Sequence, residues 1–130
     1  MGERMRQVAI IVDDDEATRK SLRFLLECEG IVVEDYADAT QLIAAPSWPP
    51  RAGCMVLDLH MPGMTGIEVL EALRRGGSKV PVVIVTGHPN GANRRRAMAS
   101  GALEFLEKPL NDGRIVELVR AALENGPSPG

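Results

Sequence analysis

Carboxylate, hydroxyl and ammonium side chains follow short apolar segments at four places in this 130-residue chain. Asp13 and Asp14 follow the first segment, Asp58 another, Thr86 a third and Lys108 the last. If these segments are parallel strands of one sheet, their carboxyl ends meet at one edge, where neighbouring strands lie about 4.8 Å apart. Three carboxylates that close repel one another unless a cation neutralises them. Hard oxygen ligands with room for water suit Mg²⁺, or Mn²⁺ in its place.

The apolar residues of the chain alternate between the periods typical of strands and of helices. Strands are expected at residues 8–12, 31–36, 54–57, 82–85 and 103–106. Helices are expected through Thr18–Leu26 with an end at Gly30, and then at Asp38–Ala45, Ile67–Arg75, Asn90–Ser100 and Ile115–Leu123. Three of the strands are apolar at every position, as parallel strands covered on both faces require.

Five such strand–helix units predict an α/β fold, a doubly wound five-stranded parallel sheet that is written (βα)5. The chain allows two strand orders, and the order 2-1-3-4-5 places the first and third strands side by side, with a ligand site at their carboxyl ends. The length excludes an eight-unit barrel. It fits one domain, which we assign to residues 1–125, with residues 126–130 as a tail or the start of a linker.

The composition is that of an ordinary globular protein, with 45% hydrophobic and 25% charged residues. A net charge of −3 is too small to indicate a polyanionic partner, so direct binding of nucleic acid by this domain is not expected. No apolar segment is long enough to span a bilayer, and the first residues do not match a signal peptide, which predicts a cytoplasmic protein without membrane contact. Cys28 and Cys54 lack metal-ligand spacing and are expected to be buried, reduced thiols.

Four motifs at the expected strand ends resemble the signatures of bacterial response-regulator receiver domains. The motifs are Val12–Glu16, Val56–Gly66, Thr86–His88 and Glu107–Pro109. The resemblance runs from about Val8 to Leu123, and the last three motifs are similar to the nitrogen-fixation regulator (FixJ) branch, whose members often carry a C-terminal helix-turn-helix domain. The resemblance implies a flavodoxin-like receiver fold. It also implies a phosphorylation-dependent switch of a two-component phosphorelay.

In that family, the position of Asp58 is the phospho-acceptor, which takes its phosphoryl group from a histidine kinase. The resemblance implies that Asp13, Asp14, Asp58 and the backbone carbonyl of His60 bind the metal ion. A carboxylate is a weak nucleophile, but it can attack a phosphorus whose charge is neutralised and whose leaving group is in line.

The remaining matches concern how a phosphoryl group would be bound and sensed. Thr86 and Lys108 match the residues that offer a hydroxyl and an ammonium group to phosphoryl oxygens. Phe105 matches the aromatic residue that follows such a threonine inward, which would reshape the face formed by the helix at residues 90–100, the last strand and the last helix. That face would control an output partner or domain, and a homodimer through it is an alternative. The bond between Lys108 and Pro109 matches a family position that is commonly cis.

Three further features have more than one interpretation. His60 and His88, the two histidines of the chain, either face solvent at the rim of the site, bind a transition metal together with carboxylates, or modulate the rate of dephosphorylation. Asp15 and Glu16 are expected only to cap a helix and favour its dipole. The run of residues 94–96, all arginine, is either a solvated face or a docking site, and both interpretations stay open.

Three rival functions remain beside the switch. A phosphatase or phosphotransferase that forms an aspartyl phosphate in turnover usually has a second acid two residues after the nucleophile, where this chain has His60. A flavodoxin-like nucleotide-binding module would need a glycine-rich phosphate loop instead of carboxylates after the first strand. A degenerate receiver that serves as a scaffold would not keep the full acid, hydroxyl and amine set. We therefore expect a switch that catalyses only its own phosphorylation and dephosphorylation, not a turnover enzyme.

Overall fold

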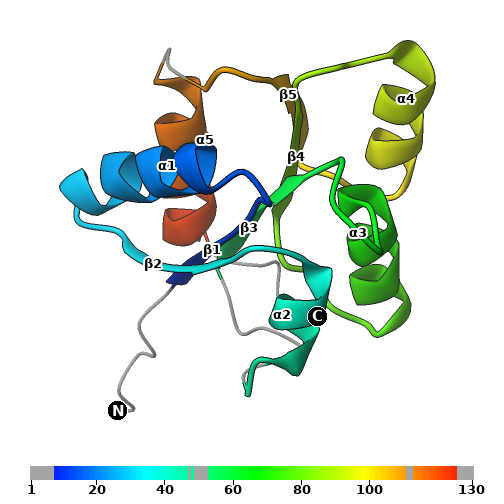
Figure 1. The fold of residues 1–130 in the computed structure, drawn as a ribbon, viewed down its shortest axis with the longest axis horizontal. Coiled ribbons are helices and arrows are strands. Elements are labelled where there is room, and N and C mark those ends of the chain that lie inside the picture. The colour runs from blue at the N-terminus through cyan, green and yellow to red at the C-terminus, as the bar shows by residue number, and fades with distance from the viewer. Residues whose placement is uncertain (1–7, 47, 49–52, 111–112, 126–130) are drawn as a thin grey trace.

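A computed structural model describes residues 8–46, 48, 53–110 and 113–125. Its centre is a five-stranded parallel sheet with helices on both faces (Figure 1). The strands are β1 (Val8–Val12), β2 (Val32–Tyr36), β3 (Cys54–Asp58), β4 (Val82–Thr86) and β5 (Glu104–Glu107). The helices are α1 (Glu16–Cys28), α2 (Ala39–Ala44), α3 (Gly66–Arg75), α4 (Gly91–Ala99) and α5 (Arg114–Asn125).

The strands lie in the order β2-β1-β3-β4-β5, and every neighbouring pair is parallel. This confirms the predicted (βα)5 fold and its strand order. Val12 of β1 pairs with Leu57 of β3, and Asp58 pairs with Val85 of β4. The last residues of these three strands therefore share one edge of the sheet, at the point where the strand order reverses.

The sheet separates two apolar cores, because successive residues of a strand face opposite sides. Met55 and Leu57 of β3 belong to the core under α2, α3 and α4. Cys54 and Val56 of the same strand belong to the core under α1 and α5, which lie on the opposite side of the sheet in Figure 1. All residues of β3 and β4 are buried, as their continuous apolar sequences predict.

Local sequence decides where the helices next to the sheet edge begin. The Asp15 carboxylate accepts a hydrogen bond from the N–H of Ala17 and caps α1, as expected. Thr65 and Glu68 form a reciprocal capping box at the start of α3. A Cβ atom on Gly66 would lie 2.5 Å from the backbone oxygen of Asp58, so glycine is required for α3 to begin this close to the end of β3.

The two cysteines differ in environment, and the prediction that Cys28 is buried is wrong. Both thiols are free, but Cys28 is exposed and Cys54 is buried. Helix α1 buries Leu22 and Leu26, and Cys28 lies about 200° around the helix from Leu26, on the solvent side. Burial raises the pKa of the Cys54 thiol to about 12, which makes it unreactive.

Other differences from the predicted elements are small. Strand β5 spans residues 104–107, one residue later than predicted, and β2 begins one residue later as well. No helix within the described ranges is both long and apolar enough for a membrane span. The predicted tail, residues 126–130, and the first seven residues of the assigned domain lie outside the described residues.

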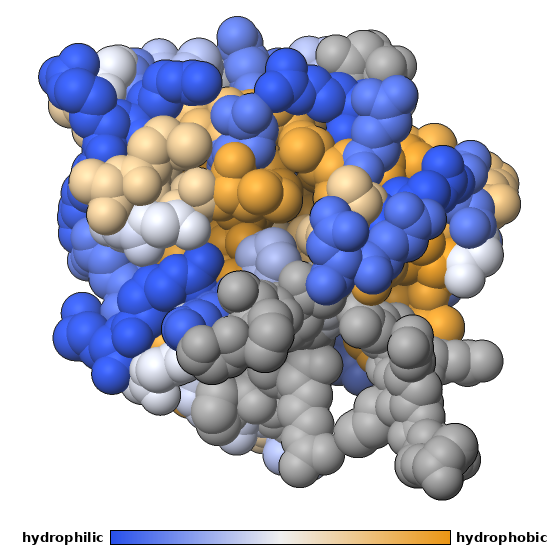
Figure 2. Space-filling view, turned by 180° about the vertical axis from the view of Figure 1, so that it is seen from behind, coloured by the Kyte–Doolittle hydropathy of each residue, from blue (hydrophilic) through white to orange (hydrophobic). Residues whose placement is uncertain are grey.

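The surface carries hydrophobic as well as charged areas. Figure 2 shows hydrophobic residues gathered in the middle of one face and hydrophilic residues around them. Among the described residues, the large hydrophobic side chains that are exposed are Phe24, Ile43, Met98 and Leu103. Single exposed apolar residues are ordinary, but Phe24, at 70% exposure, lies beside a groove that is described below.

Candidate functional site

The carboxyl edge of the sheet brings the predicted acidic and basic side chains together. Asp13 follows β1, Asp58 ends β3 and Lys108 follows β5. The Nζ atom of Lys108 lies 2.9 Å from Asp13 Oδ2 and 3.3 Å from Asp58 Oδ1. One carboxylate oxygen from each of Asp13, Asp14 and Asp58 lies within 4.8 Å of the other two. Strand ends that are distant in sequence therefore form one cluster.

Burial determines the electrostatics of this cluster. Asp13 and Asp58 are 3% and 4% exposed, whereas Asp14 faces solvent. Burial and then the neighbouring Asp13 charge raise the pKa of Asp58 to about 7, although Lys108 opposes the shift. Burial disfavours the ammonium form of Lys108, but its contacts with Asp13 and Asp58 outweigh this effect and raise the pKa of Lys108. Three carboxylates face one ammonium group, which leaves negative charge for a cation to neutralise.

The donor atoms of the cluster fit a hard divalent cation. All three are carboxylate oxygens, and two ligands of one Mg²⁺ ion are about 3–4 Å apart, so small side-chain adjustments would suffice. Asp14 is exposed, which leaves one side open for water ligands. In the described part of the chain this is the only group of three or more such ligands, and it contains no histidine. The interpretation of His60 and His88 as transition-metal ligands therefore gains no support.

The two histidines lie at the rim of the site. Both His60 and His88 are exposed, and their ring centroids are 6.4 Å apart. They lie near each other because each follows the end of a strand by two residues, and those strands, β3 and β4, are neighbours. Thr86 lies below them, fully buried, and its hydroxyl oxygen accepts a 3.0 Å hydrogen bond from the His88 N–H.

Backbone hydrogen bonds hold the segment that follows β3. Leu59 donates its N–H to the carbonyl of Val85 at 2.8 Å, and Gly66 donates to the carbonyl of Leu59 at 3.0 Å. The segment that carries His60 is therefore anchored at both ends beside Asp58. This anchoring fixes the backbone on both sides of His60 next to the carboxylate cluster.

Arg19 supports the site but was not singled out from the sequence. Its Nη1 atom donates a 2.8 Å hydrogen bond to the backbone carbonyl of Asp13, and its Nε atom lies 2.8 Å from Asp35 Oδ2. Arg19 thus ties α1 and β2 to the residue that follows β1. The only sequence signal was a basic residue one turn into the helix that follows an acidic cluster, and such residues are common on solvated helix faces.

The aromatic residue predicted to sense the phosphoryl group lies behind the site. Phe105 is 4% exposed, belongs to the core under α2, α3 and α4, and pairs with Ile84 of β4. Ile84 precedes Thr86 by two residues on the same strand.

Farther along, the peptide bond between Lys108 and Pro109 is cis, as expected.

Comparison with known proteins gives the family. Residues 9–120 match the response regulator receiver domain. The chain belongs to this family. The receiver is 42% identical to the transcriptional regulatory protein FixJ of Azorhizobium caulinodans, over 87% of this chain and 53% of that protein. It is 40% identical to the C4-dicarboxylate transport transcriptional regulatory protein DctR of Rhodobacter capsulatus, over 87% of this chain and 58% of that protein.

A solved structure agrees with these relatives. The crystal structure of FixJ-N superposes on the receiver with a TM-score of 0.82 at 35% identity, over 99% of this chain and 100% of that one. The receiver spans about half the length of the curated relatives that it matches. Members of the family are phosphorylation-dependent signalling switches that histidine kinases phosphorylate, and they bind Mg²⁺ at an acidic pocket. The receiver has a carboxylate cluster at that place.

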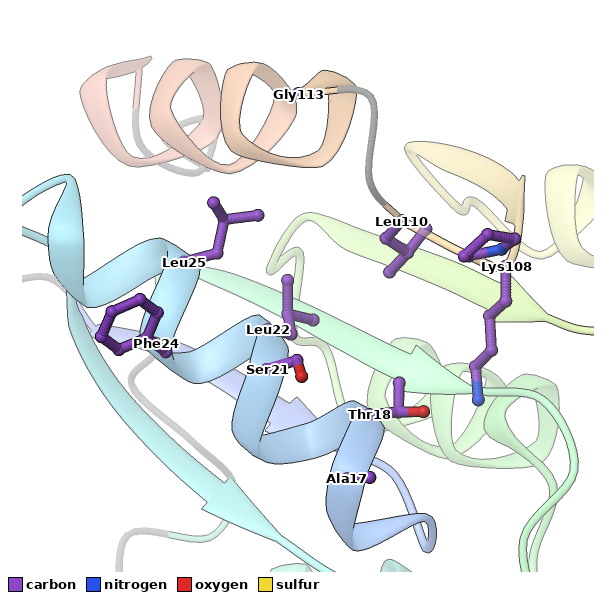
Figure 3. Close-up of a pocket in the computed structure, with 10 residues that line it drawn as sticks. Ala17, Thr18, Ser21, Leu22, Phe24, Leu25, Lys108, Leu110 and Gly113 are labelled. Atoms are coloured by element: carbon purple, nitrogen blue, oxygen red, sulfur yellow. The ribbon is translucent and has the colours of Figure 1, made fainter.

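A groove on the α1 side of the receiver was not predicted from the sequence. It has a volume of about 770 Å³ and lies between α1 and the segment that joins β5 to α5 (Figure 3). Leu22 and Leu25 of α1 and Leu110 of the joining segment line it, and Lys108 lies at one end. One indication of a groove was present in the sequence. The small and apolar residues of α1 cover a wider face of the helix than its two buried leucines occupy.

Proposed function

We propose that Asp58 is the phospho-acceptor of this receiver and that a histidine kinase supplies the phosphoryl group. The observation that carries the proposal is the convergence of Asp58, Asp13, Asp14 and Lys108 at one sheet edge. Within the cluster, Asp58 is the buried carboxylate at the end of β3, and its neighbours can compensate the charge that a phosphoryl group brings.

The chemistry requires an in-line displacement at phosphorus. A carboxylate oxygen of Asp58 forms the new bond to phosphorus, and the bond from phosphorus to the imidazole nitrogen of the donor breaks, with its electron pair staying on that nitrogen. Lys108, already 3.3 Å from Asp58 Oδ1, would bind a phosphoryl oxygen. A divalent cation held by Asp13, Asp14, Asp58 and the His60 carbonyl would neutralise charge on the carboxylates and the phosphoryl oxygens.

Thr86 and Phe105 would convert the new group into a change of shape. The Thr86 oxygen already accepts the His88 N–H, so its hydroxyl proton is the part that a phosphoryl oxygen can bind. Movement of Thr86 toward that oxygen leaves space that the Phe105 ring occupies. The face of α4, β5 and α5 would then control an output partner or domain, and a homodimer through this face is an alternative outcome.

His60 and His88 would modulate how long the aspartyl phosphate lasts, because both lie at the rim through which water must reach the phosphorus. We expect the receiver to catalyse only its own phosphorylation and dephosphorylation. Enzymes that turn over an aspartyl phosphate usually have a second acid at the position that His60 occupies here. Replacement of both histidines by alanine should change the first-order loss of the phosphoryl group. An unchanged rate would remove them from the mechanism.

The groove beside Lys108 is the surface that we propose the kinase contacts. It is apolar, it contains the exposed Phe24, and it ends at a residue that touches Asp58. A Phe24→Asp variant should lose phosphorylation by the kinase but keep phosphorylation by acetyl phosphate, which needs no protein surface. Equal loss with both donors would contradict a docking role.

We propose that residues 1–125 form the receiver domain, that residues 126–130 are a tail or the start of a linker, and that the receiver acts in the cytoplasm. Its relatives carry output domains. We therefore propose that an output domain, and not the receiver, would make any contact with nucleic acid.

Incubation with acetyl phosphate and Mg²⁺ followed by intact mass measurement tests this proposal. The receiver should gain one phosphoryl group, and Asp58→Asn and a chelator should each abolish the gain. Ser21→Ala, in the groove and away from the carboxylates, should leave the gain intact. A gain that persists in the Asp58→Asn variant would contradict the proposal.

A further inference from the structure

Three neighbouring arginines on α4 have three different environments. The Nη1 atom of Arg94 donates a 3.2 Å hydrogen bond to the backbone carbonyl of Phe105, and its guanidinium carbon lies 5.9 Å from the centroid of the Phe105 ring. Arg96 instead forms two hydrogen bonds with Glu71 of α3. Arg95 is exposed, and its side chain makes no hydrogen bond or ion pair with any described residue. The run is therefore not one uniform solvated face.

Arg94 also contacts a charge on β5. Its Nη2 atom lies 3.7 Å from Glu104 Oε1, and the other oxygen of that carboxylate lies 2.6 Å from Arg114 Nη2 of α5. Through Glu104 the Arg94 side chain thus joins α4, β5 and α5. It is the only one of the three arginines that contacts the residue proposed to sense phosphorylation.

The start of α4 has little other support beside β5. A cavity of about 330 Å³ lies there, lined by the α4 entry residues Pro89, Asn90 and Gly91 and by Arg94, Phe105 and Glu107. Ala97 is the buried residue of α4. Arg94 therefore covers a ring that has the core on one side and open space on the other, and its contacts hold the ring on the open side.

We propose that Arg94 is a positioning residue that holds the Phe105 ring inside the receiver. The inference rests on the proposed function, in which the ring moves inward when Asp58 is phosphorylated. In this structure the ring is inside, under the guanidinium, so the contacts of Arg94 belong to the arrangement that phosphorylation favours. Because coupling between two events is reciprocal, a residue that favours the inward ring also favours the phosphorylated receiver.

The magnitude of the effect should be modest. The Arg94 side chain is 56% exposed, so its ion pair with Glu104 contributes little. The hydrogen bond to the Phe105 carbonyl and the guanidinium over the ring contribute more. Loss of these contacts should lower the ratio of inward to outward ring by about fivefold, and with it lower the phosphorylated fraction at limiting donor.

The two phenylalanines of the chain make the ring directly observable. Receiver labelled with ring-¹³C phenylalanine should give one set of signals from the buried Phe105 and one from Phe24, which is 70% exposed and serves as an internal reference. Arg94→Ala should move the Phe105 signals toward those of Phe24 and leave the Phe24 signals in place. Arg95→Ala is the matched control and should change neither set. Unchanged Phe105 signals in Arg94→Ala would overturn the proposal.

A second measurement separates positioning from simple packing. The fraction phosphorylated by limiting acetyl phosphate with Mg²⁺ should fall in Arg94→Ala and stay constant in Arg95→Ala. A constant or increased fraction in Arg94→Ala would also overturn the proposal. If Arg94→Ala does not fold, Arg94→Met keeps the length and the helix propensity and carries the same expectations. If the unaltered receiver takes up no phosphoryl group, the proposed function fails, while the ring signals still decide whether Arg94 holds Phe105.

Discussion

Helices α3 and α4 are neighbours on the same side of the sheet and are held there by opposite means (Figure 1). Helix α3 buries Gly66, Ile67, Val69, Leu70 and Leu73 against the sheet. Helix α4 buries Ala97 and reaches its neighbours through polar contacts, from Arg94 to β5 and from Arg96 to Glu71 of α3. Ser100, which caps the end of α4, also bonds Glu71.

The difference shows which helix can respond to a phosphoryl group. Apolar packing is dense and permits few alternative positions, so α3 holds the end of β3 and Asp58 in place. Exposed ion pairs are weak and can be exchanged for water or for other partners, so α4 can move without the loss of a core. The receiver thus combines a rigid site with an adjacent helix that is easy to displace.

The largest effect should come from the core side of α3. Leu70 is fully buried, and Leu70→Ala should lower the free energy of unfolding by about 2–5 kcal/mol because it leaves a cavity. Met98 of α4 is 40% exposed, and Met98→Ala should change the free energy of unfolding by no more than about 0.5 kcal/mol. Urea unfolding measures both. Equal losses would mean that α4 is packed as firmly as α3, and the comparison would fail.

The first residue of each helix allows a sharper comparison. Alanine at Gly66 would place its Cβ 2.5 Å from the Asp58 carbonyl oxygen, so Gly66→Ala should lower stability by about 1–3 kcal/mol and slow phosphorylation by acetyl phosphate. Alanine at Gly91 would meet only the end of the flexible Arg95 side chain, at 3.1 Å. Gly91→Ala should therefore leave the free energy of unfolding unchanged or raise it by up to about 1 kcal/mol.

Thermal unfolding and the initial rate of phosphorylation test this pair. If Gly66→Ala were tolerated with an unchanged rate, α3 would not need to begin against Asp58. A destabilised Gly91→Ala variant would show that α4 is anchored at its first turn as well.

The smallest effect concerns the link between the two helices. The hydrogen bond to Arg96 lowers the pKa of Glu71, because this contact stabilises the ionised carboxylate. Arg96→Ala should speed amide hydrogen exchange in α4 by about two- to fivefold at low salt and leave α3 unchanged. High salt should give the unaltered receiver the same faster exchange, because salt screens exposed pairs. Arg95→Ala is the control, and faster exchange in α3 would contradict the account.

The order of elements and the composition of the cluster could be predicted because both depend on local patterns. Continuous apolar runs predicted the buried strands, and the polar residue after each run predicted what meets at the sheet edge. Parallel pairing in the order 2-1-3-4-5 then brings Asp13, Asp58 and Lys108 together.

Features that depend on tertiary packing could not be predicted in the same way. The exposed position of Cys28 follows from which face of α1 meets the sheet. The three environments of Arg94, Arg95 and Arg96 follow from the rotation of about 100° per residue together with the positions of Glu71 and Phe105. The groove that contains Phe24 depends on how the segment after β5 runs beside α1, which no local pattern specifies.

The location of the phosphoryl group on the chain is the most direct test of the account. After reaction with acetyl phosphate and Mg²⁺, reduction with borohydride converts an aspartyl phosphate to homoserine, and tandem mass spectrometry of the peptides locates that residue. We expect homoserine at position 58 and unaltered aspartate at positions 13 and 14. Homoserine at position 13 or 14, or at none of the three, would contradict it.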